Sequence, residues 1–183
     1  MEELEMIILE AEDRMDKALA SFERELSTVR TGRANASLLD SIAIEYYGVM
    51  TPLKQVSSIT IPEANQLYIK PFDKSIIKEI EKAIAASSLG LTPQNDSVGI
   101  RLILPKMTEE RRRELTKVVG KMEEQAKVNV RNLRRDANDD VKKLDLPEDD
   151  EKYALDEIQK LTDQKIEKVA EIAEKKNKDV MSI

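Results

Sequence analysis

Three residue types with distinctive chemistry are missing from this chain of 183 residues, which contains no cysteine, no histidine and no tryptophan. Their absence excludes thiol nucleophiles, disulfide bonds, Cys/His zinc sites and the imidazole general base of many enzymes. Asp and Glu total 36, so a carboxylate metal site or a pair of catalytic carboxylates stays open. The composition favours a protein that is not an enzyme, and we expect no cofactor and no metal.

Aromatic residues are also scarce, at 3% of the chain, whereas charged residues make up 36%. This balance is typical of long amphipathic helices. No apolar run reaches the length of a transmembrane segment, and the acidic start MEELEMIILEAED is unlike a secretory signal. We therefore expect a cytoplasmic protein without a membrane partner.

Three long helices are predicted from the spacing of apolar residues. From Leu4 to Val29 these residues recur every three or four positions without a break. A second helix is predicted from Thr108, the N-cap of a capping box, to about Leu144. A third follows a short turn and starts at Glu148. None can bury its apolar face alone, so the pattern predicts an antiparallel three-helix bundle.

The segment between the first two helices differs in composition, because it holds all but one of the glycines and all but one of the prolines. Alternating apolar residues and turn signals predict four strands, at residues 41–47, 55–61, 66–72 and 97–104. A helix is predicted after Asp73, with Gly90 placed to end it in the left-handed conformation. These elements predict a small β/α/β domain.

The expected fold class is therefore α+β, with the β/α/β domain inserted into the bundle. We expect the bundle to comprise residues 1–30 and 106–183, and the inserted domain residues 31–105. Two connections, at about 30–33 and 104–107, suggest a hinge. Its residues would be Thr31, Gly32, Arg33, Pro105 and Lys106.

A row of basic residues, here called the basic stripe, is the strongest functional signal. The net charge of the chain is −6, the wrong sign for a simple nucleic-acid binder. On a helical wheel of the second long helix, however, basic residues gather opposite the apolar ones. The basic residues are Arg113, Lys117, Lys127, Arg131, Arg134, Arg135 and Lys142. The predicted apolar face is Leu115, Val118, Val119, Met122, Ala126, Val130, Leu133, Ala137 and Leu144.

A solvated helix face is the ordinary explanation of such a row, and two features argue against it. Acidic residues four positions ahead of the basic ones are sparse from Lys127 to Arg135, so we expect little neutralisation along the helix. The centre of the row is arginine, whose planar fork suits phosphate and base edges. Scarce aromatics disfavour base stacking, so the stripe predicts contact with the phosphates and shape of folded RNA.

Three further features have competing interpretations. Tyr46-Tyr47-Gly48 resembles a stacking pair, but one tyrosine inside and one outside a small sheet is favoured. The acidic residues 149–151 are better explained by the dipole of the helix they begin than by a bound cation. Gly120 either permits close helix packing or is simply tolerated.

An ordered set of short motifs resembles the ribosome recycling factor family along essentially the whole chain. The motifs are VRTGRA at 29–34, EYYG at 45–48, TPL at 51–53, TEERR at 108–112, VRNLRRDA at 130–137 and QKLTD at 159–163. Each motif alone is weak, but the order is highly specific. Two departures are Met50, where the family commonly has proline, and a shorter turn at residues 145–148.

The resemblance implies an L-shaped, monomeric, two-arm molecule that binds large-subunit ribosomal RNA after termination. It implies that elongation factor G, which hydrolyses GTP, acts with it to split the subunits. The family's RNA-contacting arginines correspond to Arg131, Arg134 and Arg30, with Arg135 beside them. We expect Arg134→Ala to weaken large-subunit binding with little loss of stability, because the wheel places Arg134 away from the apolar face.

Two other functional classes compete with this interpretation. The first is a helical interaction module or chaperone-like adaptor, whose binding would be insensitive to salt. The second is a carboxylate-metal hydrolase, for which no convergent Asp/Glu pattern occurs on an apolar helix face.

Overall fold

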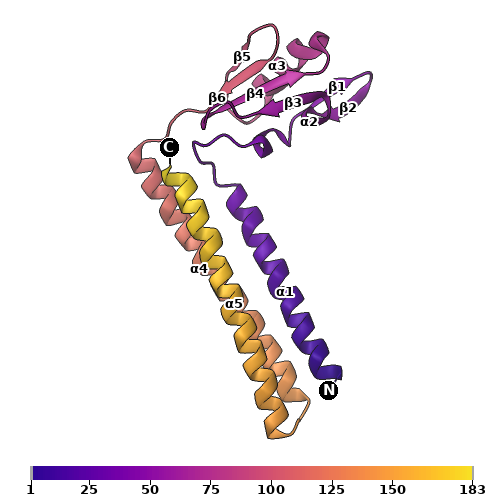
Figure 1. The fold of residues 1–183 in the computed structure, drawn as a ribbon, viewed down its shortest axis with the longest axis vertical. Coiled ribbons are helices and arrows are strands. Elements are labelled where there is room, and N and C mark those ends of the chain that lie inside the picture. The colour runs from indigo at the N-terminus through magenta and orange to yellow at the C-terminus, as the bar shows by residue number, and fades with distance from the viewer. Residues whose placement is uncertain (1, 183) are drawn as a thin grey trace. The chain divides into compact units, whose positions relative to one another are not determined.

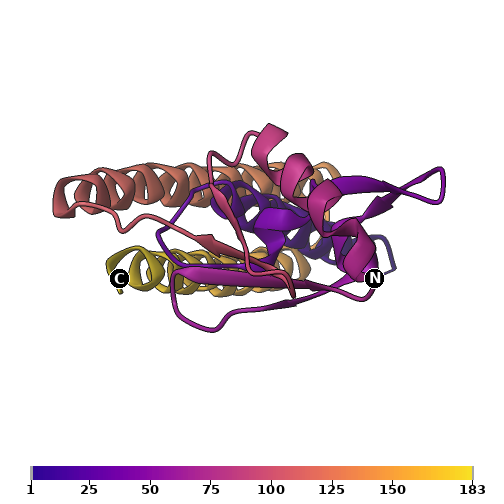
Figure 2. The ribbon, with the colours of Figure 1, turned by 90° about the horizontal axis from the view of Figure 1, so that it is seen from above.

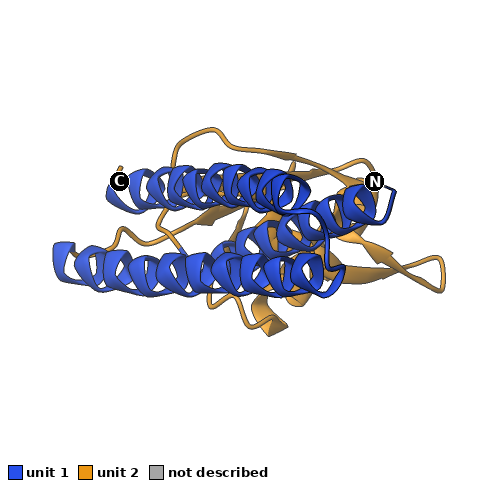
Figure 3. Ribbon diagram, turned by 90° about the horizontal axis from the view of Figure 1, so that it is seen from below, with its two compact units in different colours: residues 1–30, 109–181 blue, residues 31–108, 182–183 orange. Residues whose placement is uncertain are grey.

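The computed structural model describes residues 2–182 and divides the chain into two compact units. The first unit contains residues 1–30 and 109–181, and the second contains residues 31–108 (Figure 3). The return to the first unit thus falls at residue 109, a few positions later than the predicted 106. Within residues 2–182, no helix has the length and apolar character that crossing a membrane requires.

The first unit is a bundle of three long helices, as the apolar spacing predicts. They are α1 (Glu2–Ser27), α4 (Glu109–Lys143) and α5 (Glu148–Met181). Helix α4 runs antiparallel to both α1 and α5 (Figure 1). It lies beside α5 along most of its length (Figure 2). The prediction of an antiparallel three-helix bundle is confirmed.

The bundle core is narrow and forms two clusters along the helices. The first cluster is Leu19, Phe22, Leu26, Val119, Ala126, Val169 and Ala173. The second, nearer the α4–α5 turn, is Leu4, Ala11, Ala137, Val141, Ala154 and Ile158. Alanine recurs in both, which allows the helix backbones to approach closely. Most of the stability of such helices comes from this burial rather than from helix propensity.

The second unit begins with a short 3-10 helix η1 (Ala36–Leu39) and a hairpin of β1 (Ala43–Tyr46) and β2 (Val49–Pro52). Its turn places Tyr47 at φ 49° and Gly48 at φ 79°, the two positive values that a type I′ turn needs. The predicted strand at 41–47 is therefore present in shortened form. Strand β2 was not predicted, because it has no apolar alternation and ends in a proline.

A four-stranded antiparallel sheet follows the one-turn helix α2 (Leu53–Val56). Its strands are β3 (Ser57–Thr60), β4 (Gln66–Pro71), β5 (Pro93–Asn95) and β6 (Ile100–Ile103), in the order β3-β4-β6-β5. Strands β3, β4 and β6 match predicted strands, whereas β5 was not predicted. The first residues of the predicted 55–61 strand belong to α2 instead.

Helix α3 (Ile77–Ala86) follows the 3-10 turn η2 (Lys74–Ile76). The Asp73 side chain caps this turn by accepting a hydrogen bond from the Ser75 N–H (2.9 Å), so the predicted helix start is confirmed. Gly90 has the predicted positive φ of 68° but lies four residues beyond the end of α3. It shapes the loop toward β5 rather than capping the helix.

The core of the second unit is built only from residues of that unit. Leu67, Ile69, Ile100 and Leu102 of the sheet are fully buried in one cluster with Ile80 and Ile84 of α3. Gly99 enters β6 so close to β4 that an added Cβ would lie 2.7 Å from the Ile69 carbonyl oxygen. The prediction of an inserted β/α/β domain is confirmed, and we call this second unit the inserted domain.

Candidate nucleic-acid interface

Helix α4 buries one face in the bundle and leaves the other in solvent. The buried residues are Leu115, Val119, Ala126, Val130, Ala137 and Val141. Two details differ from the predicted apolar face: Val118 is 42% exposed, and Val141 is buried. At 100° per residue, Val118 lies about 100° from the centre of the buried face and Val141 only about 40° from it.

The basic stripe spans both the exposed face of α4 and its border with α5. Arg113, Lys117, Arg135 and Lys142 are exposed, whereas Lys127, Arg131 and Arg134 are half-buried. Arg30, beyond the end of α1, is exposed as well. The structure thus brings the seven stripe residues onto one side of α4, and it separates them into a solvent-facing row and a row at the border with the buried face.

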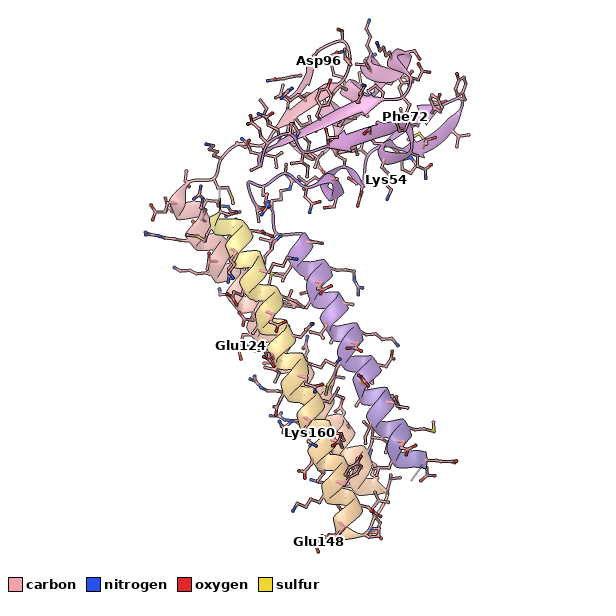
Figure 4. All side chains as sticks on the ribbon, viewed as in Figure 1. Lys54, Phe72, Asp96, Glu124, Glu148 and Lys160 are labelled. Atoms are coloured by element: carbon pink, nitrogen blue, oxygen red, sulfur yellow. The ribbon has the colours of Figure 1, made fainter. Side chains whose placement is uncertain are left out.

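Carboxylates pair with several members of the stripe, contrary to the predicted lack of neutralisation. Lys127 Nζ lies 2.9 Å from Glu123 Oε1, and its side chain is only 21% exposed. Arg131 Nη1 lies 3.5 Å from an oxygen of Glu124, which sits midway along α4 (Figure 4). That expectation was wrong on two counts. Lys127 has an acidic residue four positions ahead of it, and Arg131 reaches across two helical turns, which a search at four-residue spacing misses.

Arg113 is paired in the same way, with Nη2 2.6 Å from Glu109 Oε1. Exposed ion pairs of this kind typically contribute less than about 1 kcal/mol. Each can therefore be exchanged for a phosphate contact at little cost. The paired cations remain available to RNA, but part of their charge is cancelled in the free protein.

Three exposed members of the stripe have no carboxylate partner. Within residues 2–182, no ion pair is formed by Lys117, Arg135 or Lys142. Lys121 shares this condition and lies about 40° from Lys117 around the helix. The predicted basic stripe did not include Lys121, although the position of Lys121 on the helical wheel places it beside Lys117. Lys117, Lys121 and Arg135 lie within about 40° of one another around α4 and form a cationic surface without ion pairs among the described residues.

Arg134 occupies the border between α4 and α5 rather than the face opposite the core. Its Nη1 donates a hydrogen bond to Gln159 Oε1 of α5 (2.9 Å). Its Nε is buried and has no acceptor among the described residues. The expectation that Arg134 lies away from the apolar face is therefore wrong. Arg134→Ala would remove an interhelical hydrogen bond together with the charge.

Gln159 belongs to this site but was not among the site residues predicted from the sequence. Its Nε2 donates to Asp163 Oδ1 (2.9 Å), one turn further along α5. Both residues fall in the QKLTD motif, but α4 and α5 have to be aligned before their closeness to Arg134 becomes visible. The site is therefore built from two helices rather than one.

The predicted hinge residues lie where the chain passes between the two units. Gly32 is buried, Thr31 is half-buried, and Pro105 and Lys106 are exposed. The Arg33 N–H donates weakly to Thr31 Oγ1 at 3.4 Å. Whether these segments bend remains a prediction.

Both ends of the inserted domain are fastened to one turn. The Ala34 N–H donates to the Ala64 carbonyl (2.7 Å), and the Leu104 N–H donates to the Asn65 carbonyl (2.8 Å). We call residues 64–65 the anchor turn. It brings the entry and exit of the inserted domain to one place in that domain.

The remaining candidates have structural explanations. Tyr46 is half-buried and Tyr47 is 86% exposed, with the rings edge to face at 4.5 Å, so one tyrosine faces inward as predicted. The acidic residues 149–151 lie in the first turn of α5, which begins at Glu148 (Figure 4). Within residues 2–182, no group of Asp and Glu has an arrangement that would hold a metal ion.

Comparison with known proteins agrees with the motif order. The family model described as ribosome recycling factor matches residues 22–181. The chain is 55% identical over 181 residues to the ribosome-recycling factor of Geobacillus thermodenitrificans, covering 97% of this chain and 98% of that protein. It is 56% identical over 182 residues to the ribosome-recycling factor of Acholeplasma laidlawii, covering 100% and 99%.

Two solved structures match over nearly the full length. A solution structure of the ribosome recycling factor aligns with a TM-score of 0.82 and 42% identity, covering 100% of both chains. The second comes from models for the T. thermophilus ribosome recycling factor and the E. coli elongation factor G bound to the E. coli post-termination complex. It aligns with a TM-score of 0.66 and 41% identity, covering 97% of this chain and 98% of that one.

Proposed function

The chain belongs to the ribosome recycling factor family, and on this premise we propose that it binds the ribosome after termination of translation. With elongation factor G and GTP, it promotes separation of the ribosomal subunits and release from the messenger RNA. The support comes from the full-length relatives and from the matched structure that carries elongation factor G on the post-termination complex.

We propose that the bundle contacts large-subunit ribosomal RNA through the basic stripe. The observation that carries this proposal is the row of exposed cations on α4, Lys117, Lys121 and Arg135, which form no ion pair with any residue that the structure describes. Phosphates attract such a row, because counterions are released when Lys and Arg neutralise them. The whole chain has a net charge of −6 although the stripe is basic, so the rest of the chain is acidic; it disfavours RNA contact elsewhere and helps to orient the protein.

The proposed role requires no covalent chemistry from this chain. Hydrolysis of GTP belongs to elongation factor G, and this protein acts by binding and by transmitting movement. We propose that it works as a cytoplasmic monomer without a cofactor. The predicted hinge residues, Thr31, Gly32, Arg33, Pro105 and Lys106, would let the inserted domain move while the bundle stays on RNA.

Co-sedimentation with large ribosomal subunits across a salt series tests the RNA contact. We expect wild-type binding to weaken steeply with salt. Arg135→Ala should bind about fivefold more weakly at low salt and reduce the salt slope by about one, because one phosphate contact is lost. Its thermal stability should be unchanged, since Arg135 is exposed and unpaired.

Arg24→Ala is the matched control, because it removes an exposed arginine from α1. This variant should bind like the wild type. Binding that is insensitive to salt would instead favour a helical module that recognises protein. Equal binding by Arg135→Ala and the wild type would remove the basic stripe from the RNA interface.

A further inference from the structure

Arg134 is held in a different way from its neighbours in the basic stripe. Arg113, Lys127 and Arg131 each meet a carboxylate of α4 itself. Arg134 instead donates to the neutral side-chain amide of Gln159 on α5 (2.9 Å). A neutral acceptor fixes the guanidinium without cancelling its charge. Arg134 is thus both oriented and fully charged.

Asp163 determines which end of the Gln159 amide faces Arg134. The amide N–H₂ donates to Asp163 Oδ1 (2.9 Å), so the amide oxygen is left pointing at the guanidinium. The reverse orientation would place the amide N–H₂ against the arginine donors and the amide oxygen against the carboxylate. The three residues therefore form a directional chain from Asp163 through Gln159 to Arg134.

The position of Arg134 is not one that bundle stability alone would select. Its Nε is buried without an acceptor among residues 2–182, and an unsatisfied buried donor destabilises the fold. The side chain is nevertheless kept at the α4–α5 border, beside the solvent-facing cations of the stripe. A constrained, charged guanidinium loses less conformational freedom when it binds a phosphate.

We infer that Gln159 and Asp163 are positioning residues that hold Arg134 ready for phosphate contact with RNA. This inference rests on the proposed function, because it assigns a role within the same RNA-binding site. Gln159 and Asp163 act through Arg134. The neutral amide of Gln159 orients the Arg134 guanidinium without pairing it with a carboxylate, and Asp163 orients that amide.

Asp163→Ala tests the inference, because general electrostatics and the positioning role predict opposite changes in RNA affinity. General electrostatics predicts tighter RNA binding, since one negative charge is removed from the bundle. The positioning role predicts binding about threefold weaker, because the Gln159 amide is no longer oriented. The probe is the large ribosomal subunit, and affinity is measured by co-sedimentation at low salt.

Glu167→Ala is the matched control, since it also removes one exposed carboxylate from α5. Glu167 lies one turn beyond Asp163, about 40° further around α5, and lines a shallow depression beside Asp16 and Leu19 of α1. Its binding should equal or slightly exceed that of the wild type. If Asp163→Ala binds as tightly as Glu167→Ala, the inference is overturned.

Gln159→Glu separates orientation from charge. A carboxylate at residue 159 keeps the interhelical contact with Arg134 and cancels its charge. The new ion pair offsets the lost hydrogen bond to Asp163 and the repulsion between the two carboxylates, so the melting temperature should change little. Binding should weaken about tenfold, because the phosphate now competes with a fixed carboxylate. A residue with only a structural role would leave binding unchanged. Gln164→Glu, which adds the same charge on the α1 side of α5, should bind like the wild type.

A double-variant comparison completes the test. In a Gln159→Ala background, Asp163→Ala should have no further effect on binding, because Asp163 acts only through Gln159. Additive losses would overturn the inference. Failure of the wild type to bind large subunits would overturn the proposed function and this inference together. Loss of binding in Arg135→Ala, with normal binding by Gln159→Glu and Asp163→Ala, would overturn this inference alone.

Discussion

At the scale of single residues, Asp96 shows how one carboxylate can fix a turn. Its Oδ1 accepts hydrogen bonds from the N–H groups of Val98 (3.0 Å) and Gly99 (2.7 Å), and Tyr68 donates to its Oδ2 (3.0 Å). These bonds favour the ionised form, and those from Gly99 and Val98 do most to hold the pKa of Asp96 below its ordinary value. The turn carries the chain from β5 into β6 at the outer edge of the sheet (Figure 4).

Replacing Asp96 should change how the stability of the inserted domain depends on pH. Because the folded state lowers the pKa, the stabilisation is present above the unfolded value of about 3.9 and is lost as the pH falls below it. Asp96→Asn should therefore be less stable than the wild type at pH 7, and the difference should shrink below about pH 4. Thermal unfolding from pH 7 to pH 3 measures this. A difference that stays constant across that range would contradict the assignment.

Arg134 and Arg135 show which properties of a site can be predicted from the sequence and which cannot. Both follow from the VRNLRRDA motif, but a helical wheel places Arg135 about 160° from the centre of the buried face of α4 and Arg134 only about 60° from it. Their environments differ, because Arg134 meets Gln159, a residue 25 positions away on another helix. No wheel of one helix contains that contact, since it depends on the alignment of α4 with α5. The charge row could be predicted, whereas the orientation of its members could not.

At the scale of elements, α4 is a helix of 35 residues with a glycine in its interior. Gly120 has no atom within 4 Å of the position that a Cβ would take, and it is exposed. Close packing is therefore not the reason for this glycine. It lowers helix stability by leaving the unfolded chain more freedom.

Gly120→Ala should stabilise the bundle by about 1 kcal/mol, the difference in helix propensity between the two residues. Urea unfolding followed by helical circular dichroism gives the change. Binding to large ribosomal subunits should be unaltered, since alanine adds neither charge nor bulk to the stripe. A loss of stability would show that the position is more crowded than its surroundings indicate.

Long helices can be predicted from local sequence patterns more reliably than short strands. The bundle helices were predicted nearly to their ends, because each repeats its apolar pattern over many turns. Strand β5 has only three residues, Pro93–Asn95, and none of them is a good strand former. It exists because it pairs with β6, with Gln94 opposite Arg101. Such a strand is produced by tertiary pairing and leaves no local pattern.

At the scale of the whole molecule, the two units have separate cores. Every buried residue of the inserted-domain cluster lies between Ala34 and Leu104, and the bundle clusters use none of them. Residues 31–108 should therefore fold as an isolated fragment, with a free energy of unfolding of roughly 4 kcal/mol. Cooperative thermal unfolding of the fragment would support this. A fragment without a transition would show that its core needs the bundle.

The anchor turn at residues 64–65 has a mechanical consequence for the inserted domain. Because Ala34 and Leu104 are both bonded to this turn, any pull arriving through the two connections enters the domain at one point. We expect the load to fall first on these two backbone hydrogen bonds, and the one between Leu104 and Asn65 continues the register of the ladder between β4 and β6. The two ends of the inserted domain should therefore move together, and a pull on them should reach the sheet through this end of the ladder.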